Sequence, residues 1–162
     1  MEQPSPVEPA ELDLAQLAYL LGLRANETVL RALHRAGFVG LRPSHGFLFQ
    51  HLLGGPCTMA DLAARLDVSQ QAVSKAVREL RSLGYVKSQP AHGTRAQRIL
   101  LTERGEAAVS KARALRAKAD AQLAAQVGSG RLLRAKQVLA TALRVQGGTQ
   151  AVRLRRVRMP RG

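Results

Sequence analysis

The spacing of the hydrophobic residues predicts helices over most of the chain. Residues 11–36 place Leu, Ala and Tyr side chains on two stripes of one long helix, which favours contact with more than one neighbour. After two glycines, Pro43 opens a short helix that extends to Leu53. Only five residues of the chain are aromatic. We therefore expect a core of Leu, Ala and Val, which suits helices better than a sheet sandwich.

Residues 58–83 predict two helices joined by a tight corner. Thr58 and Asp61 are spaced as in a capping box, which starts a short helix. The three residues 67–69 are too few for anything but a tight corner, and the Ser69 hydroxyl is a good N-cap for the next helix. A short helix, a corner and a second helix form the helix-turn-helix pattern.

The second of these helices has one apolar face and one polar face. Its apolar residues recur every three or four positions and are expected to face the core: Val73, Ala76, Val77, Leu80 and Leu83. Gln side chains pair with adenine, Lys and Arg pair with guanine or phosphate, and a helix N-terminus suits a phosphate. Residues of these types form the other face, which is either a DNA-reading surface or an ordinary solvated one: Ser69, Gln70, Gln71, Ser74, Lys75 and Arg78.

A β-hairpin is predicted after this helix, because two short apolar–polar runs, 85–89 and 97–101, flank a glycine-containing loop. A hairpin in this position is the arrangement of a winged helix. Arg95 at the hairpin tip is expected either to enter the minor groove, where the negative potential over narrow A-tracts attracts arginine, or to be a free loop charge. Arg98 is expected on the strand, near phosphate.

Two further helices and a basic tail complete the chain. Thr102 caps a helix that runs to about Val127, and a Gly-Ser-Gly break separates it from a last helix over about 131–145. Together with the N-terminal helix they are too long and too apolar to be covered by one winged helix, so a partner subunit is the simplest cover. The tail from Thr149 carries five arginines and no acid. It is expected either to follow DNA phosphates or to be a disordered, solubilising end.

Charge and hydropathy narrow the function classes. The formal net charge is +14, yet residues 1–30 carry five acids against one base, so the basic excess lies in the remainder. Such an excess favours a polyanionic partner, nucleic acid before an anionic membrane. The acidic, proline-rich start lacks the features of a signal peptide, and no segment holds about 18 unbroken apolar residues. We expect a soluble, cytoplasmic protein with no membrane partner.

Catalytic and metal sites are not expected. The sequence shows no carboxylate pair in a suitable context, no nucleophile motif and no phosphate loop, so we predict neither enzyme activity nor a cofactor. His34, His45, His51 and His92 lack metal-ligand spacing. Cys57 is the only cysteine, which excludes an intrachain disulfide, and we interpret it as an inert, small apolar residue.

Residues 58–105 resemble the winged helix of the MarR family of bacterial transcriptional regulators. The segments TMADLAARLDVSQQAVSKAVRELRSLGYV and ILLTERG carry the resemblance. The second segment does so because Leu-Thr-x-x-Gly after a wing, followed by a long helix, is characteristic of that family. Over about residues 11–146 the order of helices also fits the family layout. Three features differ. No acidic residue precedes Arg95 in the wing, and Asp67 stands where the family often has Gly. The arginine-rich tail also lies beyond the usual family length.

The resemblance implies a mainly α fold with a small β-hairpin wing, in which long N- and C-terminal helices form a dimerisation layer around a winged helix-turn-helix core. We accordingly divide the chain into a flexible arm, a dimerisation helix, a DNA-binding domain, C-terminal dimerisation helices and a basic tail: 1–10, 11–40, 41–105, 106–146 and 147–162.

The resemblance also implies partners. Members of the family are homodimers that bind a roughly palindromic operator in double-stranded DNA, usually to repress, and that are often released by a small phenolic or other effector. Four residues fall where the family's ligand crevice would lie, with core packing as the alternative for each: His34, Phe38, His45 and Phe49.

Two function classes stay open. One is a sequence-specific, effector-responsive repressor, and the other is a non-specific basic nucleic-acid coat or architectural protein. The first should lose about 1–3 kcal/mol of binding free energy per wrong base pair, and the second almost nothing. We favour the repressor because the basic side chains share a capped helix with adenine-pairing Gln rather than lying in diffuse clusters.

Overall fold

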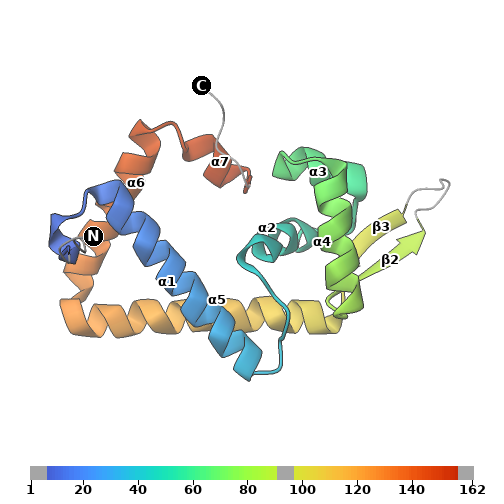
Figure 1. The fold of residues 1–162 in the computed structure, drawn as a ribbon, viewed down its shortest axis with the longest axis horizontal. Coiled ribbons are helices and arrows are strands. Elements are labelled where there is room, and N and C mark those ends of the chain that lie inside the picture. The colour runs from blue at the N-terminus through green and yellow to red at the C-terminus, as the bar shows by residue number, and fades with distance from the viewer. Residues whose placement is uncertain (1–6, 91–96, 157–162) are drawn as a thin grey trace, which may run out of the picture.

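The computed structural model describes residues 7–90 and 97–156, which form a winged helix carried on long terminal helices (Figure 1). This confirms the predicted mainly α fold with a small β wing. In chain order the elements are a 3-10 turn at Pro9–Glu11, α1 Leu14–Arg35, α2 Pro43–Leu52, β1 Cys57–Thr58, α3 Met59–Leu66, α4 Gln70–Ser82, β2 Val86–Pro90, β3 Gln97–Leu101, α5 Glu103–Val127, α6 Ser129–Val145 and α7 Thr149–Arg153.

Helix α1 begins three residues later than the hydrophobic pattern predicts, because Asp13 caps it. The Asp13 carboxylate accepts a hydrogen bond from the Gln16 amide at 2.9 Å. Helix α1 crosses α5 (Figure 1), and Val29 and Leu33 are its only buried residues. The first half of α1 leaves most of its leucines exposed, so the second neighbour that its pattern predicts is not supplied by the described part of the chain.

The helix-turn-helix forms through the local hydrogen bonds that the sequence predicts. Thr58 Oγ1 accepts from the Asp61 amide at 3.1 Å, and the Asp61 carboxylate accepts from the Thr58 amide at 3.2 Å, which completes the capping box. At the corner, Asp67 has φ 57° and takes the left-handed conformation that ends α3. Ser69 Oγ then accepts from the Ala72 amide at 3.2 Å and starts α4.

The sheet has one strand more than the predicted hairpin. β2 and β3 pair antiparallel with Val86 opposite Leu101, as expected. The two-residue β1 pairs with the other edge of β3, placing Cys57 opposite Ile99. β1 is too short to leave a periodic signal in the sequence. The wing tip, including Arg95, lies outside the described residues.

Tyr85 lies at the centre of the core and is fully buried. Its hydroxyl donates to the Val39 carbonyl at 2.8 Å, and its ring meets Phe49 edge-on with centroids 6.2 Å apart. The remaining core is rich in Leu and Val, as composition predicts, and includes Leu48, Leu62, Leu80, Ile99, Val73, Val77 and Val86.

The C-terminal third departs from the prediction at its end. Thr102 caps α5 by accepting from the Gly105 amide at 3.1 Å, and α6 begins at Ser129, two residues earlier than predicted. Beyond α6 the chain turns back and forms α7, with Ala151 buried. The disordered alternative for the basic tail is therefore wrong for residues 149–156. In the described ranges no helix is long and apolar enough to cross a membrane.

Gly105 provides a test of the contact between α5 and Tyr85. A Cβ at this position would lie 2.2 Å from the Tyr85 carbonyl oxygen, so backbone would have to move. We expect Gly105→Ala to lower the free energy of unfolding by about 1–3 kcal/mol, measured by urea denaturation.

Gly130→Ala is the matched control, because nothing lies within 4 Å of a Cβ at this helical position. It should leave the free energy of unfolding unchanged or raise it by less than about 1 kcal/mol. Equal stabilities of the two variants would show that α5 does not pack on Tyr85 as described.

Candidate nucleic-acid interface

The polar residues of α4 lie on its outer face, opposite the core. Val73, Val77 and Leu80 are buried, whereas the predicted reading residues are exposed or, for Ser74, partly exposed. In the part of the chain that the structure describes, no side-chain hydrogen bond or ion pair engages the predicted α4 contacts Gln70, Gln71, Ser74, Lys75 and Arg78. Their donors and acceptors therefore face solvent and can meet a ligand.

The size and ends of α4 suit the DNA major groove. Thirteen helical residues span about 20 Å at 1.5 Å each, and a groove about 12 Å wide admits a helix. Because Ser69 satisfies only one of the first amides, the N-terminus of α4 keeps donors for a phosphate.

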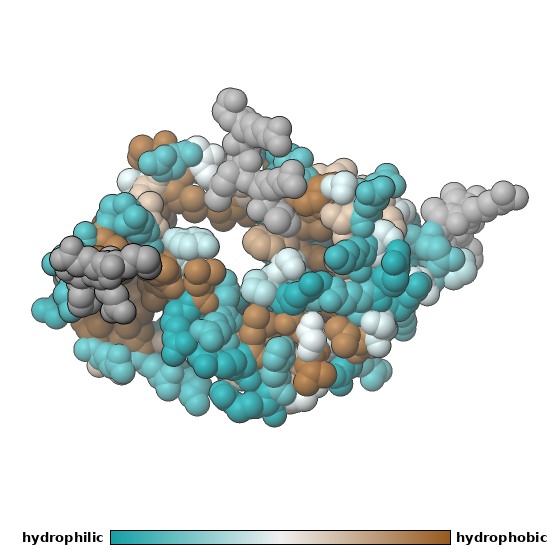
Figure 2. All heavy atoms as spheres, in the orientation of Figure 1, coloured by the Kyte–Doolittle hydropathy of each residue, from teal (hydrophilic) through white to brown (hydrophobic). Residues whose placement is uncertain are grey.

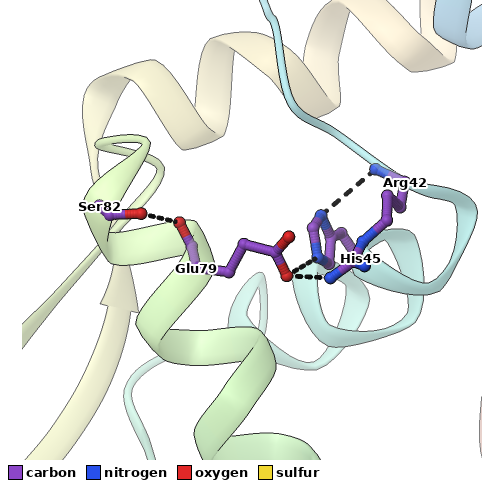
Figure 3. Close-up of polar contacts among 4 residues, drawn as sticks. All are labelled: Arg42, His45, Glu79 and Ser82. Carbon is purple, nitrogen blue, oxygen red and sulfur yellow. Dashed lines mark hydrogen bonds and ion pairs between the residues drawn. The ribbon is translucent and has the colours of Figure 1, made fainter.

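The acidic side chain of α4 points away from this face. Glu79 is the one acid of α4, and its carboxylate forms an ion pair with the Arg42 guanidinium beside α2 (Figure 3). The exposed charged side chains of α4 are thus the basic residues Lys75, Arg78 and Arg81. On the wing, Arg98 is exposed on β3, opposite Thr58 of β1.

A cavity of about 150 Å³ lies between α1, α2 and α5. Its walls are apolar, with Val29, Leu33 and Val109 among them. Of the four residues predicted for a ligand crevice, His45 and Phe49 line this cavity. His34 is exposed and Phe38 packs beneath the Arg104 guanidinium, 5.8 Å from its ring centroid, and neither belongs to the lining.

The cavity also has cationic residues that the sequence analysis did not single out. Arg42, Arg113 and Arg116 contribute to its lining, and Arg116 donates to Asn26 Oδ1 at 2.9 Å. The spacing of Arg113 and Arg116 puts both on one side of α5, which was readable from the sequence. That this side faces α2 is set by tertiary packing.

His45 links the cavity to α4. The Arg42 amide donates to His45 Nδ1 at 3.3 Å, which leaves the proton of the neutral ring on Nε2. Nε2 is buried without a well-formed hydrogen bond in the described part of the chain, and its nearest acceptor is Glu79 Oε2 at 3.5 Å (Figure 3). Burial, with a smaller contribution from the Arg42 charge, lowers the pKa of His45 to about 4.

The sequence also raised a reactive cysteine and a metal site as candidates. Cys57 is buried in β1, and its thiol accepts from Arg65 Nη1 at 3.4 Å. Within residues 7–90 and 97–156, no cluster of three or more His, Cys, Asp or Glu side chains is arranged to hold a metal ion.

Comparison with known proteins agrees with this geometry. Residues 39–96, which span the helix-turn-helix and the start of the wing, match the model of the MarR family. The chain has the MarR fold. The family resemblance inferred from the sequence is thereby confirmed. No curated protein sequence matches the chain.

Solved MarR-type structures share the arrangement of helices at low sequence identity. A MarR family transcription regulator superposes with a TM-score of 0.66 at 23% identity, over 81% of this chain and 86% of its own. MarR from E. coli in its apo form superposes with a TM-score of 0.60 at 15% identity, over 82% of this chain and 98% of its own. A variant of MepR from S. aureus bound to an oligodeoxyribonucleotide superposes with a TM-score of 0.60 at 16% identity, over 84% of this chain and 99% of its own.

The His45 environment predicts a pH dependence of stability in this MarR-type fold. The folded pKa of about 4 lies below the unfolded value of 6.5, so the unfolded chain binds a proton in this range that the folded chain does not. The stabilisation is complete above pH 6.5 and is lost as the pH falls toward 4. At 1.36 kcal/mol per unit, we expect a loss of about 2 kcal/mol by pH 5.

His45→Gln is the control for this titration. A Gln at this position of the helix can accept the Arg42 amide and carries no titratable proton. Chemical denaturation between pH 7.5 and 5 should therefore show the steeper loss in the wild type. Parallel pH profiles for the two proteins would contradict the assignment.

Proposed function

We propose that this protein is a sequence-specific regulator of transcription that binds double-stranded DNA in the cytoplasm, as a homodimer, and represses until an effector releases it. The observation that carries the proposal is the outer face of α4, which presents Gln71, Lys75 and Arg78 to solvent while its one acid is held by Arg42. The MepR variant solved with an oligodeoxyribonucleotide, which shares this fold, supports the choice of DNA.

Exposed apolar side chains on α1 and α6 support the homodimer. Figure 2 shows hydrophobic atoms at the surface where these two helices lie. Nonpolar residues of this size are normally buried, and a second copy of the same surface is the simplest two-fold cover. The exposed residues include Leu14, Tyr19, Leu20, Leu21 and Leu23 of α1 and Leu133, Val138 and Val145 of α6.

The alternative is a non-specific nucleic-acid coat or architectural protein, which a basic surface alone would equally support. The two functions differ in the symmetry and the sequence dependence of the bound DNA. A homodimer that inserts two copies of α4 should select half-sites about one helical turn apart. A coat protein should select neither a sequence nor a spacing.

Selection of bound duplexes from a random DNA pool tests the proposed function. We expect the wild type to enrich one pseudo-palindromic sequence. Gln71→Ala or Lys75→Ala should relax the sequence preference at the base that each side chain contacts. Each variant should bind the duplex selected by the wild type with an affinity about 5- to 150-fold lower.

Lys118→Ala on α5 is the matched control for Lys75→Ala, because it removes the same charge from an exposed helical position outside α4. It should leave the selected sequence unchanged. If the α4 variants weaken binding equally on all duplexes, or if the wild type enriches no sequence, the coat-protein alternative is correct.

The effector part of the proposal rests on the cavity between α1, α2 and α5. Its volume of about 150 Å³ accommodates a single aromatic ring, and its apolar walls with cationic Arg42, Arg113 and Arg116 suit an aromatic carboxylate or phenolate. An anion there would compete with Glu79 for Arg42. Because Glu79 belongs to α4, the competition gives the effector a direct route to the DNA-reading helix.

Benzoate is a suitable probe for this site. We expect Arg113→Gln to weaken benzoate binding about 10- to 100-fold in calorimetry, since a charge-assisted hydrogen bond is lost. Arg131→Gln on α6, outside the cavity lining, should bind benzoate as the wild type does. If both variants bind benzoate equally, or the wild type does not bind it, this effector class is wrong while the DNA function stands.

A further inference from the structure

The C-terminal segment is folded back by two glycines. Gly147 ends α6 with φ 76°, and the Gly148 amide donates to the Leu143 carbonyl at 2.9 Å. A Cβ on Gly148 would lie too close to Leu143 Cδ1, so a larger residue in this turn requires the Leu143 side chain to move. The chain reverses here and brings α7 to the side of the winged helix, facing α3 (Figure 1).

Arg155 fastens the end of this segment to α2. It has φ 52°, a left-handed conformation that glycine usually occupies at a helix end, and the following Arg156 amide closes the turn on the Ala151 carbonyl at 2.9 Å. Arg155 Nη1 donates to both the carbonyl and the Oε1 of Gln50, at 3.1 and 3.0 Å. His51 Nε2 lies 3.3 Å from the Arg155 carbonyl. The side chain of Arg155, absent from glycine, is what makes this attachment.

An open groove of about 580 Å³ lies between α7 and the α2–α3 surface. We call it the arginine groove, and its charged lining residues are Arg65, Arg153, Arg155 and Arg156. Among residues 7–90 and 97–156, no acid contributes to the lining. Burial lowers the pKa of His51, and the hydrogen bond with the Arg155 carbonyl opposes this effect. The Arg65 and Arg155 charges lower the pKa of His51 further, so both lie close enough to act on this neighbour.

Four arginines held together without an acid repel one another, so this arrangement suits an anionic ligand. Planar guanidinium groups bind phosphate through paired hydrogen bonds. Arg153 and Arg156 have no side-chain partner in the part of the chain that the structure describes, which leaves their donors available. The groove therefore fits phosphate groups better than a neutral or cationic ligand.

The position of the groove favours DNA as the source of the phosphates. Arg65 lies in the last turn of α3, and in helix-turn-helix proteins the first helix crosses the DNA backbone. The MepR structure matched over 99% of its own length covers only 84% of this chain, so part of this chain lies outside the shared fold.

We propose that the arginine groove binds backbone phosphates of duplex DNA outside the base pairs that α4 reads. The C-terminal segment thus lengthens the DNA footprint without adding base readout. This inference rests on the proposed function, because it takes the winged helix to be docked on DNA.

The test compares the salt dependence of DNA binding in full-length variants. Arg153→Ala with Arg156→Ala should lower the slope of log affinity against log salt by about 2, since each lost phosphate contact contributes about 0.9. On an operator trimmed to the selected base pairs the double variant should match the wild type. Arg131→Ala with Arg134→Ala removes the same charge from α6 and should change neither quantity.

Arg155→Gly removes the attachment together with one of the four charges of the groove. Glycine suits the left-handed turn, so this variant should keep the fold of α7 while losing the contact with Gln50. We expect a slope lower by at least about 1. Circular dichroism and thermal melting check that the variants remain folded.

The outcomes distinguish the inference from the function it rests on. An unchanged slope in the Arg153/Arg156 double variant, or an equal change in the α6 control, overturns the proposal that the arginine groove binds DNA phosphates. The same follows if inorganic phosphate, titrated by NMR, binds the groove while the DNA slope is unaffected, because the site then serves a small anion. A wild type that selects no sequence, but whose slope still depends on Arg153 and Arg156, refutes the regulator and keeps the groove.

Discussion

The arrangement of every functional part depends on the burial of Tyr85, which follows α4 and precedes the wing. Its hydroxyl is tied to the Val39 carbonyl after α1, its ring meets Phe49 of α2, and its carbonyl sits against Gly105 of α5. A buried phenol needs a hydrogen-bond partner, and here the partner comes from the loop before α2. One side chain thus holds the reading helix, the cavity helix and the long C-terminal helix in fixed relation.

The ion pair between Glu79 and Arg42 separates the outer face of α4, which is cationic, from its side toward α2, which carries the carboxylate. Glu79 turns away from the solvent face of α4 and pairs with Arg42, which leaves that face cationic and places a carboxylate beside the buried His45. An ion pair of this kind contributes little to stability when it is half exposed. Its importance lies in position, because the same Arg42 lines the cavity and holds a residue of α4.

The basic residues of the chain are arranged in two geometrically distinct ways. On α4, Lys75 and Arg78 alternate with exposed Gln side chains, whereas in the arginine groove the Gln of the described lining, Gln50, is already bonded to Arg155. Base readout needs a rigid element with mixed donors and acceptors, and phosphate attraction needs only charge held near the backbone. In the proposed function, the capped helix α4 would supply the first and the short segment fastened by Arg155 the second.

The sequence by itself determined whatever depends on neighbours a few residues apart. The capping box of Thr58 and Asp61, the Ser69 cap and the apolar face of α4 were predicted correctly, because each involves residues three or four positions apart on one helix. Only the tertiary structure decided the β1 strand, the pairing of Arg42 with Glu79 across 37 residues, and the return of α7 to Gln50 across 105. Such contacts join side chains whose separation along the chain carries no periodic signal, so they become visible only when packing brings their helices together.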